Sequence, residues 1–115
     1  MDFEVTADWQ ASYAQPIRLS AGESFCLTGR REEWDGHVWL WARCAAGLEG
    51  WVPDSLVVQG PTGPRAKEDY SALELTCRVG ERLTGEREAQ GWVYCRNRSG
   101  ASGWVPRRNL AALPR

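Results

Sequence analysis

Four cysteines and one histidine are the side chains in this sequence best suited to bind a metal or attack a substrate. Cys26 and Cys44 are 18 positions apart, and Cys77 and Cys95 have the same spacing. No Cys-x-x-Cys pair, the spacing typical of zinc ligands, is present. His37 lies in an acid-rich segment, but no motif places a nucleophile beside it. The sequence therefore predicts a protein without catalytic residues, metal ligands or cofactors.

Tryptophan is unusually frequent, with 7 Trp among 115 residues. Its large amphipathic ring is enriched where one side chain must both pack and contact a partner. The length fits one ordinary domain or two small ones and is too short for the large catalytic folds. No apolar run approaches the roughly 20 residues that would span a bilayer. Binding surfaces on a protein outside the membrane are the expected use of the tryptophans.

The sequence contains an internal repeat. Gly50-Trp51-Val52-Pro53 recurs as Gly103-Trp104-Val105-Pro106, and the same offset pairs Trp39 with Trp92 without a gap. A repeat of this kind indicates two similar structural modules, each about half of the chain. The segment Gln59–Pro64 between them holds two prolines and two glycines, which stop strands. We therefore predict one domain over 1–59, a linker over 60–64 and a second domain over 65–115.

The segments between the glycines are short and strand-like. The expected strands are 25–28, 38–44, 50–52, 92–97 and 103–105. Short strands separated by glycines and polar turns predict an all-β chain with a small barrel in each repeat. Side chains alternate along a strand, so Trp39 and Trp41 share one face while Ala42 and its counterpart Cys95 face the core. Cys77 is expected in the core as well.

Several motifs of both repeats resemble those of Src homology 3 (SH3) domains. In the second repeat the matching segments are 66–70, 80–81, 92–96 and 103–106, and in the first repeat they are 5–9, 22–23, 39–43 and 50–53. The chain is similar to SH3 domains in tandem, of a bacterial-type variant. This resemblance implies two five-stranded SH3-like barrels that cover nearly the whole chain.

The resemblance also implies a peptide-binding groove in each barrel. The implied walls are Trp9, Trp39 and Pro53 in the first repeat, and Tyr70, Trp92 and Pro106 in the second. A polyproline II helix has a three-residue period and little conformational entropy to lose, so flat aromatic walls can take up its ridges. The expected partner is a protein or peptide, with a proline-rich segment as the type that this family commonly binds.

Further groove positions depart from the family pattern. Leu56 and Asn109 stand where a tyrosine is expected after the groove proline. Tyr13, in the first long loop, can serve as an additional aromatic wall. The acids in the segment 32–35 can receive a basic residue of a ligand. We count Tyr13, Leu56 and Asn109 with the implied walls as the candidate peptide-binding residues.

Two alternatives to a peptide-binding adaptor stay open. The tryptophan-rich faces can pack the modules on each other or form a homo-oligomer. The second repeat can bind single-stranded nucleic acid, because residues 61–115 hold 10 basic and 6 acidic side chains, against 4 and 9 in residues 1–60. The candidate phosphate contacts are Arg96, Arg98, Arg107 and Arg108. The near-neutral charge of the whole chain does not favour nucleic acid.

The first residues show no basic and apolar leader of the secretory type. We therefore expect the chain in the cytoplasm, where cysteines stay reduced.

Overall fold

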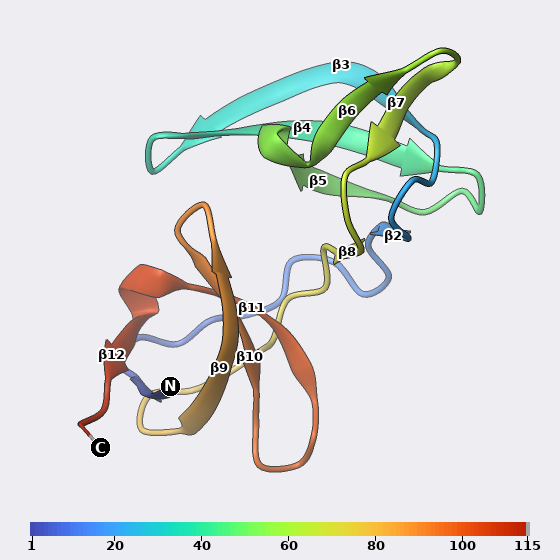
Figure 1. The fold of residues 1–115 in the computed structure, drawn as a ribbon. Coiled ribbons are helices and arrows are strands. Elements are labelled where there is room, and N and C mark those ends of the chain that lie inside the picture. The colour runs from blue at the N-terminus through green and yellow to red at the C-terminus, as the bar shows by residue number, and fades with distance from the viewer. Residues whose placement is uncertain (115) are drawn as a thin grey trace. The chain divides into compact units, whose positions relative to one another are not determined.

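The computed structural model describes residues 1–114, which form short β-strands, tight turns and two 3₁₀ helices (Figure 1). The all-β prediction is confirmed. In the described residues, no helix is long and apolar enough to cross a membrane.

The strands belong to two compact units. The central unit consists of Gln15–Ala72, and the terminal unit combines Met1–Ala14 with the chain from Leu73 onward. The predicted domains 1–59 and 65–115 therefore do not coincide with these units. The chain passes from the terminal to the central unit after Ala14 and returns after Ala72.

The terminal unit is built on one antiparallel sheet with the strand order β11-β10-β9-β1-β12. Its strands are β1 (Asp2–Val5), β9 (Arg82–Ala89), β10 (Trp92–Arg96), β11 (Ser102–Pro106) and β12 (Leu110–Ala112), with the 3₁₀ helix η2 (Arg107–Asn109) before β12. One face of this sheet forms a core to which Phe3, Val5, Leu83, Val93 and Val105 contribute. Cys77 and Cys95 belong to the same core, as predicted, with 1% and 0% exposure.

The central unit has a three-stranded sheet and two smaller strand pairs. The sheet contains β3 (Phe25–Trp34), β4 (His37–Cys44) and β5 (Glu49–Pro53), followed by the 3₁₀ helix η1 (Asp54–Leu56). A hairpin joins β6 (Val57–Gly60) to β7 (Gly63–Ala66), and β2 (Arg18–Leu19) pairs with β8 (Tyr70–Ser71). Ala42 is fully buried, as the alternation along β4 predicts.

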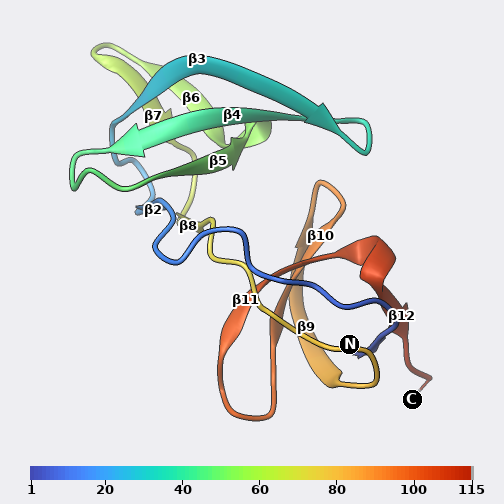
Figure 2. The same ribbon diagram turned by 180° about the vertical axis from the view of Figure 1, so that it is seen from behind.

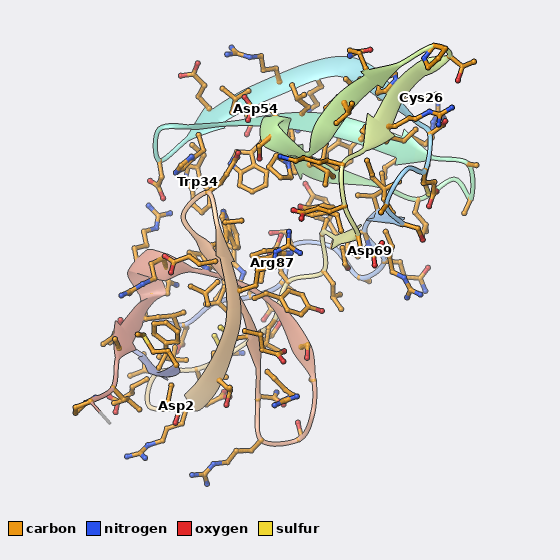
Figure 3. The ribbon with its side chains drawn as sticks, in the orientation of Figure 1. Asp2, Cys26, Trp34, Asp54, Asp69 and Arg87 are labelled. Carbon is orange, nitrogen blue, oxygen red and sulfur yellow. The ribbon has the colours of Figure 1, made fainter. Side chains whose placement is uncertain are left out.

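The acid-rich segment that contains His37 forms the tip of the β3–β4 hairpin. Trp34 pairs with His37, and Figure 3 labels Trp34 at this end of β3. Asp35 and Gly36 between them both have positive φ, 51° and 80°. Two successive positive φ angles are typical of the type I′ turn, whose twist matches that of the flanking strands. The turn lets β3 extend six residues beyond the predicted strand 25–28.

The two units have exchanged their opening strands. In the terminal unit, β1 pairs with β12 and β9. In the central unit, β7 holds the equivalent place, because it pairs with β6 and its residue Arg65 bridges to Ser24 beside β3. Figures 1 and 2 both show β1, near the N-terminus, next to β12 near the C-terminus. The opening strand of the first repeat, β1, thus pairs with strands of the second repeat. The opening strand of the second repeat, β7, pairs with strands of the first.

Matching hydrogen bonds confirm which residues are equivalent in the exchanged strands. The Val5 N–H donates to the Glu81 carbonyl at 2.9 Å, and the Ala66 N–H donates to the Glu23 carbonyl at 2.9 Å. A further pair involves aspartates: Asp8 accepts a bond from the Val79 N–H, as Asp69 does from the Ala21 N–H. Figure 3 labels Asp69 next to β8. Val5 therefore corresponds to Ala66, and Phe3, two residues earlier, corresponds to Pro64.

The predicted linker 60–64 is wrong, because these residues form the turn and the first part of the β6–β7 hairpin. Gly60 pairs with Gly63, and Gln59 pairs with Pro64. Gly63 has a φ of 122°, a conformation that glycine adopts without steric cost. The prolines and glycines that suggested a linker instead shape a tight connection between two strands.

Within residues 1–114, the strand ladders do not close into barrels, in contrast to the prediction. In the central unit, Pro64 is one reason. Met1 and Val5 both bond toward β9, so the intervening Phe3 has its N–H directed to the same strand. Pro64 occupies the corresponding position but has no N–H to donate. The central unit therefore lacks a ladder between β7 and β3 and keeps only the bridge at Arg65.

Candidate binding site

The strand exchange regroups the predicted groove residues. In the terminal unit, the ring centroids of Trp9 and Trp92 are 5.4 Å apart, at an interplanar angle of 82°. Trp92 is paired with Pro106 across β10 and β11. The implied groove walls of the first repeat were Trp9, Trp39 and Pro53, so this grouping is a correction. Trp9 faces the tryptophan of the other repeat because β1, the strand that precedes Trp9, lies in the other repeat's sheet.

Backbone and side-chain bonds fix Trp9 in this position. The Trp9 N–H donates to the Cys77 carbonyl and the Cys77 N–H donates back, both at 2.9 Å. The indole Nε1 of Trp9 donates to Glu74 Oε1 at 3.1 Å. The same carboxylate oxygen accepts bonds from the backbone N–H and the hydroxyl of Ser12, each at 3.1 Å. Glu74 thus anchors both the aromatic wall and the segment that leaves the unit.

Glu74 and Ser12 were not among the predicted groove residues. Ser12 and Glu74 are 62 positions apart, and no local motif links them. Tyr13, the next residue after Ser12, is 40% exposed.

Two other predicted groove positions of the terminal unit are structural. Pro106 is fully buried. Asn109 is 8% exposed, and its Nδ2 donates to the carbonyls of Ala7 and Asp8 at 3.3 and 3.2 Å. Asn109 therefore holds the segment that leads to Trp9, and its amide is engaged within the unit.

The corresponding residues of the central unit are Trp39, Pro53, Leu56 and Tyr70. Trp39 pairs with Pro53 across β4 and β5. Tyr70 is 8% exposed, and its hydroxyl donates to the Trp51 carbonyl at 2.8 Å. Leu56 is 3% exposed. Tyr70 and Leu56 thus belong mainly to the packing of this unit, which leaves Trp39 as its half-buried aromatic candidate.

A second set of aromatic rings is engaged by local partners. Trp41 packs edge to face on Trp51, with ring centroids 5.0 Å apart. The guanidinium of Arg30 lies over both rings, 5.0 and 4.8 Å from their centroids. The Trp41 Nε1 donates to Glu49 Oε1 at 2.8 Å. Such cation–π and hydrogen-bond contacts hold the two rings in place on the sheet. Trp41 therefore provides a matched control for Trp39, two residues earlier on the same face.

The terminal unit does not have the positive charge that the second half of the sequence suggested. After the exchange, the terminal unit holds 8 basic and 7 acidic residues, and the central unit holds 6 and 8. Arg96 lies 3.6 Å from Glu86, and Arg107 lies 3.9 Å from Glu88. Because the strand that enters the terminal unit brings acids with it, the arrangement does not favour a phosphate-binding surface.

The four cysteines are free thiols with different surroundings. Cys26 is exposed, and Cys44, Cys77 and Cys95 are buried. Burial raises the pKa of Cys95 to about 12, and burial, with the Glu81 carboxylate as a second cause, raises the pKa of Cys77. A raised pKa keeps a thiol protonated and unreactive at neutral pH.

We expect one fast-reacting thiol per folded chain at pH 8. Cys26 should react with a disulfide reagent in the native protein, and the three buried thiols should react only in denaturant. Counting the released chromophore with time gives the number directly. The Cys26→Ser variant should lose the fast phase, whereas a fast phase of two or more thiols would contradict the burial described above.

Comparison with known proteins agrees with the fold. Residues 3–59 match the family model of the variant SH3 domain. No curated protein and no solved structure matches the chain. The matched range begins in β1 and ends in β6, so it follows the first repeat along the sequence although the exchange places β1 in the terminal unit. SH3-like domains are in general binding modules without catalytic activity. This chain is therefore an all-β protein with an SH3-like domain, matched to the variant SH3 family over residues 3–59.

Proposed function

We propose that the chain is a non-enzymatic adaptor made of two SH3-like modules, which binds a peptide segment of another protein through its half-buried aromatic residues. The observation that carries this proposal is the perpendicular contact of Trp9 with Trp92, 5.4 Å between ring centroids. Both rings are only half-buried, and Tyr13 is exposed nearby in sequence. Aromatic walls of this kind suit a ligand that is already extended, such as a proline-rich segment.

The two modules contribute unequally to the proposed site. In the terminal unit, Trp9 and Trp92 together offer two aromatic surfaces. In the central unit, Trp39 stands beside Pro53, while the Tyr70 ring is buried. We therefore place the stronger peptide site in the terminal unit and a weaker one at Trp39. If one ligand engages both, the second contact gains from the effective concentration set by the connecting chain.

A proline-rich probe tests this function. We expect a peptide of ten prolines with an arginine at either end to bind the intact protein, and Trp92→Ala to weaken binding by about 2 kcal/mol or more, roughly 30-fold, as buried aromatic hot spots do. Trp39→Ala should have a smaller effect. Isothermal titration calorimetry measures the affinities, and thermal unfolding verifies that each variant is folded.

Trp41→Ala is the matched control, because Trp41 shares the face of Trp39 but packs on Trp51 and Arg30. Its affinity for the probe should stay within about twofold of wild type, as expected for a residue outside the interface. Unchanged affinity in both Trp92→Ala and Trp39→Ala, with both variants folded, would rule out binding at these residues.

One observation favours the structural alternative. The indole nitrogens of Trp39 and Trp92 are buried. Tryptophans used for packing within the chain or between copies would show this burial as well. Sedimentation separates the two functions: a structural role predicts a concentration-dependent dimer that Trp39→Ala disrupts, and a binding module predicts a monomer that takes up the peptide probe. The free thiols agree with a reducing compartment, and we propose a cytoplasmic location.

A further inference from the structure

We propose that the contact between Phe3 and Gly85 selects which set of strands receives the opening strand of the chain. This inference concerns the pairing of the repeats and does not depend on the proposed function. Each opening strand could pair with the other strands of its own repeat, which we call the contiguous pairing, or with those of the other repeat, which is the exchanged pairing found here. Both pairings use equivalent backbone positions, so hydrogen bonds alone do not distinguish them. The side chains at two of these positions differ strongly in size.

Phe3 lies against a residue without a side chain. A Cβ atom placed on Gly85 would meet Cε2 of Phe3 and, at 3.0 Å, Cδ2. The contact with Cε2 would be shorter than 3.0 Å, a distance that real Cβ atoms essentially never show, so any larger residue at this position would displace the ring. Phe3 itself is 2% exposed and belongs to the core of the terminal unit. The glycine thus creates the space that the phenyl ring fills.

The equivalent position in the central unit is occupied by leucine. Cys95 pairs with Gly85 in the terminal unit, as Ala42 pairs with Leu27 in the central unit. The strand residue that corresponds to Phe3 there is Pro64, a smaller side chain. In the terminal unit the large Phe3 therefore lies against Gly85. In the central unit the smaller Pro64 corresponds to Phe3, and Leu27 takes the place of the glycine.

The contiguous pairing would break both matches. Residues 1–5 would then lie on the first repeat's own β3, with Phe3 directed at Leu27. In the other unit, Pro64 would lie on Gly85, where it would leave unfilled volume. Overpacking on one side and a cavity on the other both destabilise a core. The exchanged pairing avoids both defects.

The connections between the units act in the same direction. Trp9 and Cys77 face each other in the terminal unit, and Tyr70 and Leu19 face each other in the central unit. In the contiguous pairing, Tyr70 would have to fold back on Cys77 through only the six residues 71–76, whereas nine residues separate Trp9 from Leu19. Short connections between elements favour exchange of those elements.

Two cysteine pairs distinguish the pairings in the full-length chain. Glu4 is opposite Ala111 in the exchanged pairing. In the contiguous pairing Glu4 would take the place of Arg65, which is opposite Val58. We would therefore prepare E4C/A111C and E4C/V58C, each in a Cys26→Ser background. Oxidation at low protein concentration, followed by peptide mass mapping, quantifies the intramolecular disulfides.

The expected result is a disulfide from position 4 to position 111 in at least about tenfold higher yield than to position 58, a ratio that corresponds to about 1.4 kcal/mol. Exchanging the sizes with Gly85→Leu and Leu27→Gly should reverse the preference. If this double variant does not fold, Leu27→Gly alone removes the obstruction and should yield a measurable disulfide to position 58.

Three outcomes would overturn the proposal. One is a dominant disulfide from position 4 to position 58 in the unaltered core. Another is a disulfide between two copies of the chain, because the exchange is then not within one molecule. The last is an unchanged preference for position 111 in the folded double variant, or in Leu27→Gly where the double variant does not fold.

Discussion

A fragment of residues 15–72 is expected to unfold cooperatively, whereas a fragment of residues 1–59, the range that matches the variant SH3 family, is expected to lack a cooperative transition. The first fragment contains all strands of the central unit, including β7 and β8. The second lacks these strands and the hydrogen bonds that Ala66 makes with Glu23 and Gly22. Modules of this size are marginally stable, so the loss of two strands should abolish folding.

Far-ultraviolet circular dichroism in increasing urea measures the two fragments under the same conditions. The control is a circular permutant of the terminal unit, in which residues 73–115 are joined to residues 1–14 by a short glycine and serine linker. The paired positions of Phe3 and Ala112 bring the two ends of the chain to neighbouring strands, so such a linker can be short. This permutant should also unfold cooperatively. A transition for 1–59 as stable as that for 15–72 would contradict the exchanged pairing.

Much of the local structure could be predicted from the sequence because it depends on local patterns. The repeat at an offset of 53 places Trp51 and Trp104 at equivalent positions, and each packs edge to face on an aromatic ring of the preceding strand. Alternation along the strands correctly predicted that Ala42 and Cys95 are buried. These features follow from the two-residue period of a strand and from the glycines that separate the strands.

Which aromatic residues come together in the candidate site could not be predicted in the same way. The motif that contains Trp9 aligns equally well in the contiguous and the exchanged pairing, because equivalent strands present equivalent backbone bonds. The size difference between Leu27 and Gly85, at positions that align poorly in the repeat, is the main feature that indicates the choice. Its meaning depends on Phe3, which is more than 80 positions from Gly85. Sequence patterns of short range carry no information about such a contact.

The burial of Leu56, Tyr70 and Asn109 shows a related limit. A family motif indicates which positions surround a groove, but their exposure depends on the side chains that pack around them. Tyr70 donates its hydroxyl to the Trp51 carbonyl, and Asn109 donates to the segment before Trp9. These bonds use the polar groups that could otherwise contact a ligand. The proposed sites therefore rely on Trp9, Trp92 and Tyr13 in the terminal unit and on Trp39 in the central unit.

Replacing Phe3 with alanine is expected to destabilise the terminal unit by about 3–5 kcal/mol, the usual cost of removing a buried phenyl ring. The ring is 2% exposed, packs against the Gly85 backbone, and lies beneath the guanidinium of Arg107, 5.1 Å from the ring centroid. Its removal leaves a cavity that Gly85 has no side chain to fill. Pro64→Ala is the matched control at the equivalent position of the central unit, where the proline is only half-buried and a change of about 1 kcal/mol or less is expected.

Amide hydrogen exchange locates the effect along the chain. In Phe3→Ala, protection should fall in β9, β10 and β12 and stay near the wild-type level in β3, β4 and β5, because local opening follows the stability of each cooperative unit. The altered residue belongs to the first repeat, so the contiguous pairing would place the loss in β3 and β4 instead. The distribution of protection therefore tests the pairing without any added cysteine or cleavage. Equal loss in both units would mean that they unfold together and that Phe3 stabilises the whole chain.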